Sequence, residues 1–180
     1  MLRDELRKGT ELGVAADQLT RKGQLVPDAM ITQLVQEWLG THGDSFVFDG
    51  FPRTVPQGVE LKRLLQERGT PLDIVLFFDV PFEEIRERVL KRVSCRSCGK
   101  IFRVGLQIAS FDESCPACGG ELFRRNDDTL EALEQRMMEY REKTAPLVSF
   151  YKECGLLVTL KAAAQPSEVF SEISSILEAA

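Results

Sequence analysis

The sequence predicts an α/β fold in which helices flank an open parallel sheet, with one small cysteine-rich insertion. SFVFD at 45–49 and DIVLFFDV at 73–80 are almost continuously apolar, as buried strands of parallel sheets are. LLVTL at 156–160 is a third such run. Stretches of helical periodicity separate these runs, and alternation of strand and helix is typical of a parallel sheet.

The helices follow from apolar spacing and from start and stop residues. The first, at 1–8, has Leu2 and Leu6 on one face and begins without a capping residue. A long helix starts at Asp128 or Thr129, and Pro146 is expected to kink or break it. The remaining helices are predicted at 11–22, 27–39, 54–68, 81–92 and 166–177.

Composition bounds the class of protein. With 180 residues, of which 43% are hydrophobic, the chain can form one main domain with a real core. A net charge of −5 argues against non-specific nucleic-acid binding. No apolar run reaches membrane-spanning length and no signal-peptide pattern is present, so we expect a cytoplasmic protein without a membrane partner. We divide the chain into a core at 1–92 and 127–180 and an insertion at 93–126.

The insertion carries the pattern of a four-cysteine zinc site. Cys95 and Cys98 form one CxxC pair, and sixteen residues later Cys115 and Cys118 form a second. Four thiolates close the coordination sphere, so the zinc would be structural rather than catalytic. The alternatives are two disulfides or unused thiols. Cys154 stands apart and is interpreted as a core or surface thiol.

A possible phosphate-binding loop follows the first predicted strand, in FVFDGFPRT. An acid at the end of a parallel strand lies at the sheet edge where ligands bind, so Asp49 could orient magnesium or its waters. Gly50 permits close approach, Pro52 stiffens the loop, and Arg53 offers a planar fork to phosphate. The competing interpretation is an ordinary turn with a solvated arginine.

Further arginines flank the insertion. Arg88 and Arg92 share one helix face before it, Arg125 follows it beside Asp127, and Arg136 lies on the next helix. Phosphoryl transfer requires several cations around the migrating charge and exclusion of water. Arginines at both ends of a mobile insertion could supply them on closure.

Together these segments resemble adenylate kinase of the bacterial type with a zinc-bearing lid. DGFPRT, GQLVPD, RRNDD and YREKTAPLVSFY look like family motifs in family order, and the resemblance spans essentially the whole chain. It implies a P-loop nucleoside monophosphate kinase-like fold and the reaction ATP + AMP ⇌ 2 ADP with magnesium. It also implies a monomer whose partners are ATP, AMP and ADP.

The resemblance also assigns residues. An AMP-binding helical part covers about 1–26, and the catalytic set comprises Asp49, Arg53, Arg88, Arg92, Arg125, Asp127 and Arg136. The AMP site would be formed by Arg3, Gln24, Leu25, Val26, Gly50, Phe51, Pro52, Arg53, Gln57, Arg125 and Arg136. The ATP site would be formed by Arg88, Arg92, Ile101, Phe102 and Gln165.

The chain departs from the family at its start. The family begins with a central strand and a GxxGxGK loop, whereas the Gly-Lys pair of this chain, Gly99-Lys100, lies in a cysteine knuckle. The match begins about thirty residues late, given the usual length of such units. Strands 45–49 and 73–80 would then flank an empty slot, and we expect such a chain to be poorly folded and inactive.

Three functions therefore stay open. The first is adenylate kinase. The second is a non-catalytic AMP-binding or zinc-ribbon interaction protein. The third is a kinase for another nucleoside monophosphate, against which Gln57 and the long insertion argue.

Overall fold

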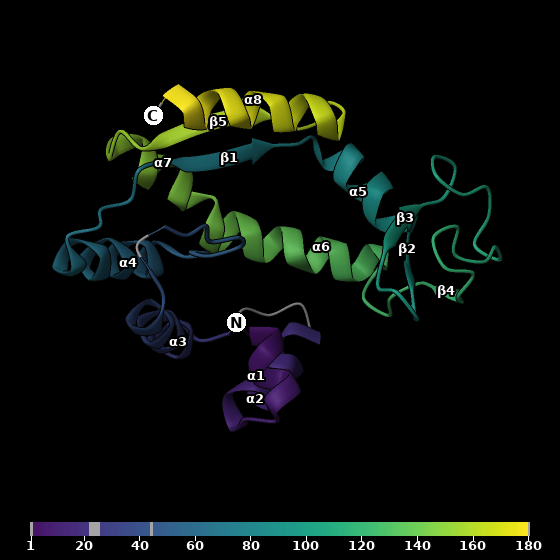
Figure 1. The fold of residues 1–180 in the computed structure, drawn as a ribbon, viewed down its shortest axis with the longest axis horizontal. Helices are drawn as coiled ribbons and strands as arrows, with labels where there is room; N and C mark the ends of the chain where they lie inside the picture. The colour runs from purple at the N-terminus through teal and green to yellow at the C-terminus, as the bar shows by residue number, and fades with distance from the viewer. Residues whose placement is uncertain (1, 22–25, 44, 180) are drawn as a thin grey trace. The chain divides into compact units, whose positions relative to one another are not determined.

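The computed structural model describes residues 2–21, 26–43 and 45–179, and it divides the chain into two compact units (Figure 1). Unit 1 comprises Met1–Asp79 and Arg136–Ala180, and unit 2 comprises Val80–Gln135. Unit 2 thus contains the predicted insertion together with the preceding helix and the start of the following one. No helix in the described part of the chain is both long and apolar enough to cross a membrane.

Unit 1 contains a two-stranded parallel sheet. Strands β1 (Val75–Asp79) and β5 (Leu157–Lys161) run side by side, with Val75 opposite Leu157 and Asp79 opposite Lys161 (Figure 1). The parallel pairing and both strand positions confirm the prediction from the apolar runs. The amide of Ala162 extends the pairing by donating to the Asp79 carbonyl, at 3.1 Å.

The prediction of a strand at 45–49 is wrong. Its backbone is not part of any strand that the structure describes, because neither β1 nor β5 pairs with it. The side chains still alternate: Phe46 and Phe48 pack against Trp38, whereas Val47 is 90% exposed. Hydrophobic packing therefore imposes a period of two without the backbone hydrogen bonds that define a strand.

The helices of unit 1 begin and end close to the predicted residues. They are α1 (Leu2–Lys8), α2 (Glu11–Arg21), α3 (Asp28–Thr41), α4 (Val55–Arg68), α7 (Pro146–Glu153) and α8 (Pro166–Ala179). Thr54 caps α4 by accepting a hydrogen bond from the amide of Gln57, and Gly69, with φ of 71°, ends it. The core between α3 and α4 contains Val35, Leu39, Leu61, Leu64 and Leu65.

A widened helical turn connects α6 (Leu130–Glu139) to α7. It is a π-helix, η1 (Tyr140–Thr144), in which the amide of Ala145 donates to the Tyr140 carbonyl at 2.8 Å. Pro146 follows directly, and a proline ring crowds the carbonyl four residues before it. The expected interruption at Pro146 is thus confirmed, as a widened turn immediately before the proline.

Unit 2 is a short helix followed by a small antiparallel sheet. Helix α5 (Phe82–Leu90) leads into β2 (Arg92–Cys95), which pairs with β3 (Ile101–Arg103) on one side and β4 (Leu122–Phe123) on the other. A separate core contains Val93, Cys95, Ile108, Cys115 and Leu122. The start of α6, also in unit 2, is capped by Thr129, whose hydroxyl accepts from the amide of Ala132 at 3.2 Å.

Candidate functional site

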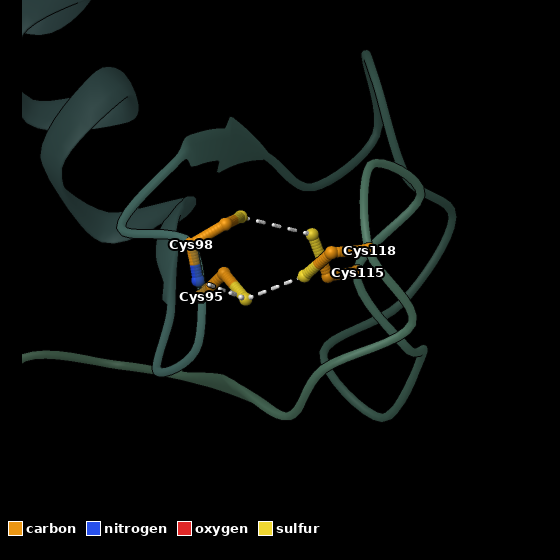
Figure 2. A group of neighbouring side chains, drawn as sticks. All are labelled: Cys95, Cys98, Cys115 and Cys118. Atoms are coloured by element: carbon orange, nitrogen blue, oxygen red, sulfur yellow. Dashed lines mark hydrogen bonds between the residues drawn. The ribbon is translucent and has the colours of Figure 1, made fainter.

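The four cysteines of the two CxxC pairs form one cluster in unit 2 (Figure 2). All four sulfur atoms lie within 4.8 Å of one another. The closest pairs join the two knuckles, with Cys95 Sγ 3.5 Å from Cys118 Sγ and Cys98 Sγ 3.7 Å from Cys115 Sγ. These separations exceed a disulfide bond of about 2.05 Å, and all four residues are free cysteines. The disulfide alternative is therefore wrong.

The cluster has the dimensions of a tetrahedral metal site. With zinc–sulfur bonds of about 2.3 Å, tetrahedral thiolates lie about 3.8 Å apart. The separations of 3.5 and 3.7 Å are close to that value. Each knuckle is closed by a glycine in the left-handed region: Gly99 and Gly119, both with φ of 71°, donate to the carbonyls of Cys95 and Cys115. The donor set thus fits zinc.

The four thiols differ in their electrostatic surroundings. The amide of Cys98 donates to Cys95 Sγ at 3.5 Å and is the main cause that lowers the pKa of Cys95 to about 6. At Cys118 the amide of Gly120 acts to lower the pKa, but Cys95 and the other thiols outweigh it and raise the pKa to about 12. The backbone amide thus favours the thiolate form at Cys95, which is the form that binds a metal.

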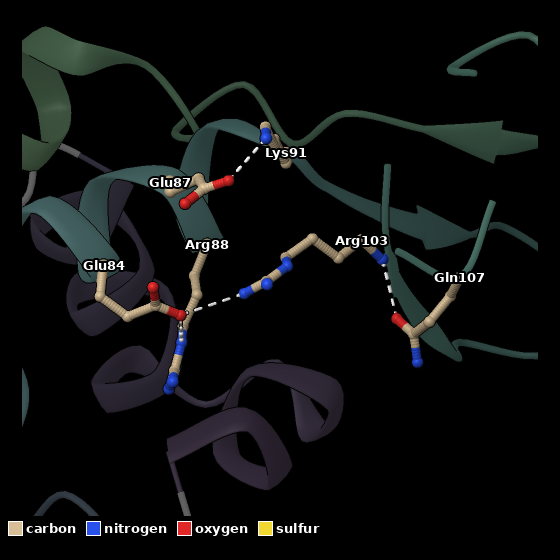
Figure 3. Close-up of polar contacts among 6 residues, drawn as sticks. All are labelled: Glu84, Glu87, Arg88, Lys91, Arg103 and Gln107. Carbon is tan, nitrogen blue, oxygen red and sulfur yellow. Dashed lines mark hydrogen bonds and ion pairs between the residues drawn. The ribbon is translucent and has the colours of Figure 1, made fainter. Parts of the chain in front are cut away.

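Two arginines predicted for the ATP side are held by carboxylates of unit 2. Arg88 on α5 donates from Nε to Glu84 at 2.7 Å (Figure 3). Arg92, the first residue of β2, forms a two-pronged contact with Asp128, with Nε 3.0 Å from Oδ2 and Nη2 bonded to Oδ1. Asp128 is 1% exposed, and its hydrogen bond is the main cause that raises the pKa of Arg92. A fixed guanidinium direction is what recognition of phosphate requires.

The other predicted residues of unit 2 lie on β3 or directly after β4. Arg125 donates from Nε to the hydroxyl of Ser94 at 3.2 Å, which ties it to β2. Asp127 is partly exposed one residue before buried Asp128. On β3, Ile101 is exposed and Phe102 packs on the unit 2 core, so the pair offers one outward and one inward side chain.

In unit 1 a hydrogen-bond network fixes the loop that carries Arg53. Arg53 Nε donates to the Gly50 carbonyl at 2.7 Å, and the Arg53 amide donates to Oε1 of Gln57 at 2.7 Å. Gly50 has φ of 71°, and a Cβ there would lie 3.0 Å from the Arg53 guanidinium. From η1, the hydroxyl of Thr144 donates to the Arg53 carbonyl at 2.8 Å.

A buried part of this network connects the loop to α3. Asp28 accepts from Gln57 Nε2 at 2.7 Å and from the Thr54 hydroxyl at 2.8 Å. Gln57 is buried and both ends of its amide are engaged, so it would have to exchange partners to contact a base. The two terminal amino groups of Arg53 have no partner among the described residues and face solvent.

Several predicted residues lie elsewhere in unit 1. Asp49 is exposed and ends no strand, so its expected place at the carboxyl edge of the sheet is wrong. Val26 is buried, whereas Gln24 and Leu25 lie outside the described residues. Gln165 is exposed just before α8, with its amide donating to Glu168 at 3.2 Å.

For the remaining predicted residues, the structure gives the helix that carries them or the side chains that they contact. Arg3 lies on α1 and Arg136 on α6. Phe51 packs against the core of unit 1, and the peptide bond between it and Pro52 is cis. Cys154 is partly buried with its sulfur 3.8 Å from Lys62 Nζ, which agrees with the interpretation as a packing thiol.

Three functional candidates were missed from the sequence: Asp28, Glu84 and Asp128. Asp28 lies within the quoted motif GQLVPD and Asp128 within RRNDD, so both motifs contained a signal. Asp128 and Thr129 were the two candidate caps of the following helix, and Thr129 performs that role. The only sequence signal for Glu84 was its position four residues before Arg88, a spacing at which side chains of a helix can form an ion pair.

Comparison with known proteins shows the family to which the chain belongs. A family model described as adenylate kinase matches residues 1–156. An adenylate kinase of Thermodesulfovibrio yellowstonii is 37% identical over 180 residues, covering 99% of this chain and 84% of the relative. Adenylate kinases of Methanosarcina barkeri and Methanosarcina acetivorans are 39% and 40% identical, covering 99% and 98% of this chain and 83% of each relative. The chain therefore belongs to the adenylate kinase family, whose members are phosphotransferases.

Proposed function

We propose that this protein transfers a phosphoryl group between ATP and AMP, giving two ADP, with magnesium accompanying ATP. The observation that carries the proposal is the state of Arg53. Its backbone and its Nε are fixed by Gly50, Gln57 and Thr144, while its terminal amino groups are unpaired within the described structure and exposed. A pre-oriented guanidinium with two open donor groups suits the phosphate of a nucleoside monophosphate.

The AMP site would be built on this loop. Arg53 would bind the phosphate together with Arg3 and Arg136, and Val26 would line the base. Gln57 would read the adenine edge after its amide leaves Asp28. Asp28 therefore keeps the empty site in a defined shape until the base arrives.

The ATP site would use the arginines of unit 2. Arg88 and Arg92, directed by Glu84 and Asp128, would neutralise the phosphates as charge develops during transfer. Ile101 and Phe102 would cover the nucleotide, and Gln165 would contact its base. Arg125 and Asp127 would act when unit 2 closes as a lid, which excludes water from the reaction.

The four thiolates would hold a structural zinc ion in this lid. Zinc supplies folding free energy to such small domains and takes no part in the transfer. Metal analysis of the purified protein should find one zinc per chain. Chelation should then abolish the protection of amides in β2 and β3, whereas protein without zinc and insensitive to a chelator would contradict the proposal.

The kinase proposal is tested by measuring ADP formation from ATP and AMP. Replacing Arg53 by Gln should lower kcat/KM for AMP by about a hundredfold, the effect expected for one pre-oriented charged donor. Arg63 on α4 is a matched control, because it is exposed and paired with Glu60 and Glu67, so Arg63→Gln should change nothing. Comparison of AMP, CMP and UMP as acceptors decides between this enzyme and another monophosphate kinase.

A second candidate is a protein that binds AMP without catalysis. One observation favours it: the loop that carries Arg53 is ordered by Gly50, Gln57 and Thr144 of unit 1, without any residue of unit 2. AMP binding that depends on Arg53 without ADP formation would support this candidate. Turnover that depends on Arg53 would reject it.

A further inference from the structure

The carboxylate of Asp28 joins two helices of unit 1 beside the loop that carries Arg53. Asp28 is the first residue of α3, and its partners Thr54 and Gln57 are the cap and part of the first turn of α4. Oδ2 accepts from the Thr54 hydroxyl at 2.8 Å, and Oδ1 accepts from Gln57 Nε2 at 2.7 Å. Both partners are buried, so neither has water as a ready substitute for the carboxylate.

Two groups fix the orientation of the Gln57 side-chain amide. The backbone N–H of Arg53 can only donate, and it donates to Oε1 at 2.7 Å. An ionised carboxylate can only accept, and that of Asp28 accepts from Nε2. A half-turn of the amide would set N–H against N–H at one end and oxygen against oxygen at the other. The orientation of the amide is therefore determined at both ends.

An amide by itself does not distinguish adenine from a 6-oxopurine such as hypoxanthine. Adenine presents an amino donor at C6 beside an acceptor nitrogen, whereas hypoxanthine presents an oxygen at C6 beside an N–H. A glutamine side chain can pair with either edge, because a half-turn exchanges its donor and its acceptor. Discrimination therefore requires a neighbour that cannot exchange the two, and the carboxylate of Asp28 is such a neighbour.

The donor to Asp28 Oδ1 has to be replaced when Gln57 turns to a base. Thr54 stays on the other oxygen, and Lys143 of η1 acts on Asp28 through its charge while its amino group donates to Glu139 at 2.7 Å. Because Oδ1 lies 2.7 Å from Nε2, the base edge that Gln57 reads also lies beside Oδ1. The two hydrogens of an adenine amino group can satisfy both residues, whereas the oxygen of a 6-oxopurine would leave the carboxylate unpaired.

We propose that Asp28 selects a 6-aminopurine over a 6-oxopurine in the acceptor nucleotide. The inference rests on the proposed function and deepens it, from a site for a nucleoside monophosphate to one that accepts adenine and rejects hypoxanthine and guanine. Gln57 supplies the contact with the base, and Asp28 decides which edge this contact accepts. The same carboxylate first holds Nε2 of Gln57 and then accepts from the amino group of the base.

The test compares the binding of AMP and of its hypoxanthine counterpart IMP to the full chain, followed by NMR at the amides of Arg53 and Gln57. The unaltered protein should bind AMP about a hundredfold more tightly than IMP, because IMP leaves a charged acceptor unpaired. Asp28→Asn keeps the size of the side chain and replaces one acceptor by a donor. AMP should then bind about tenfold more weakly and IMP about tenfold more tightly.

Asp73→Asn is the matched control. Asp73 is an exposed acid of the same unit, so its replacement removes the same charge and should leave both affinities unchanged. A variant that fails to fold cannot gain affinity for IMP, so the rise with IMP separates the proposal from a loss of structure.

Three results would overturn the inference. They are a preference for AMP that Asp28→Asn changes by less than about threefold, equal losses with both nucleotides in a folded variant, and no AMP response at the two amides. If Asp28→Asn prevents folding, the unaltered protein decides, and a preference for AMP below about tenfold rejects the inference. Failure of the proposed function is distinguishable, because it appears as absent ADP formation while the preference for AMP persists.

Discussion

The buried carboxylate of Asp128 gives the sharpest prediction about the stability of unit 2. Asp128→Asn keeps the shape of the side chain but removes its charge and turns one acceptor into a donor that faces the Arg92 guanidinium. Removing one partner of a buried ion pair costs about 3–5 kcal/mol. The Arg92 side chain is 26% exposed and regains some hydration, so we expect the low end, about 3 kcal/mol.

That loss should appear as faster hydrogen exchange in unit 2 alone. The amides of Cys95 and Val104 are suitable reporters, since each donates at 2.9 Å within unit 2. The amide of Val75, which donates to Leu156 at 2.9 Å in unit 1, is the internal reference. Protection of the two reporters should fall roughly a hundredfold, the equivalent of about 3 kcal/mol.

The exposed Asp112 provides a charge-matched control, and Asp112→Asn should leave the reporters unchanged. If Asp128→Asn changed their protection by less than about threefold, or accelerated exchange at the Val75 amide equally, then the pair with Arg92 would not stabilise unit 2 as argued. Because unit 2 has its own core, this measurement reports on unit 2 alone.

Three further predictions concern other groups. Leu65→Ala in the fully buried core of unit 1 should lower the free energy of unfolding in urea by about 3 kcal/mol, whereas Val59→Ala, at a site 52% exposed on the same helix, should cost less than about 0.5 kcal/mol. Hydrogen bonds from Arg88 and Arg103 hold the pKa of Glu84 below that of an ordinary glutamate, about 4.3. The contribution of these ion pairs to the stability of unit 2 should therefore be complete above a pH of about 4.3. It should disappear as the pH falls through the lowered pKa, in an acid titration followed at the Arg103 amide. Burial raises the pKa of Tyr151 to about 12, and its buried hydroxyl has no partner among the described residues, so Tyr151→Phe should preserve or raise stability, by up to about 1 kcal/mol. A clear loss in thermal unfolding would instead reveal a partner for that hydroxyl.

Features with local causes were predictable from the sequence. Thr54 caps α4 because its hydroxyl reaches an amide three residues ahead, and Gly99 closes a knuckle because the left-handed turn suits a residue without Cβ. The strands β1 and β5 were found because both are short apolar runs bounded by polar residues. The cysteine cluster followed from the CxxC spacing alone.

Features that depend on distant partners were not predictable. The run at 45–49 has strand composition, but a strand also needs a neighbour with open backbone groups, which no local pattern supplies. Asp28 and Asp128 serve partners 26 to 36 residues away in the chain, so nothing beside them in the sequence indicates their roles. The predicted site residues are located by the structure, and their roles in binding stay predictions.

The π-helical turn η1 has a consequence for the rotational register of unit 1. It accommodates one residue more than an α-helical turn would, and each residue of an α-helix advances the side chains by about 100°. Deletion of one residue from 140–144 would allow an uninterrupted helical path but would rotate α7 by that angle relative to α6. Leu147 and Tyr151 would then leave their buried positions, and Thr144 would lose the Arg53 carbonyl. The extra residue thus sets which face of α7 meets the core and, through the same turn, where the loop that carries Arg53 is held.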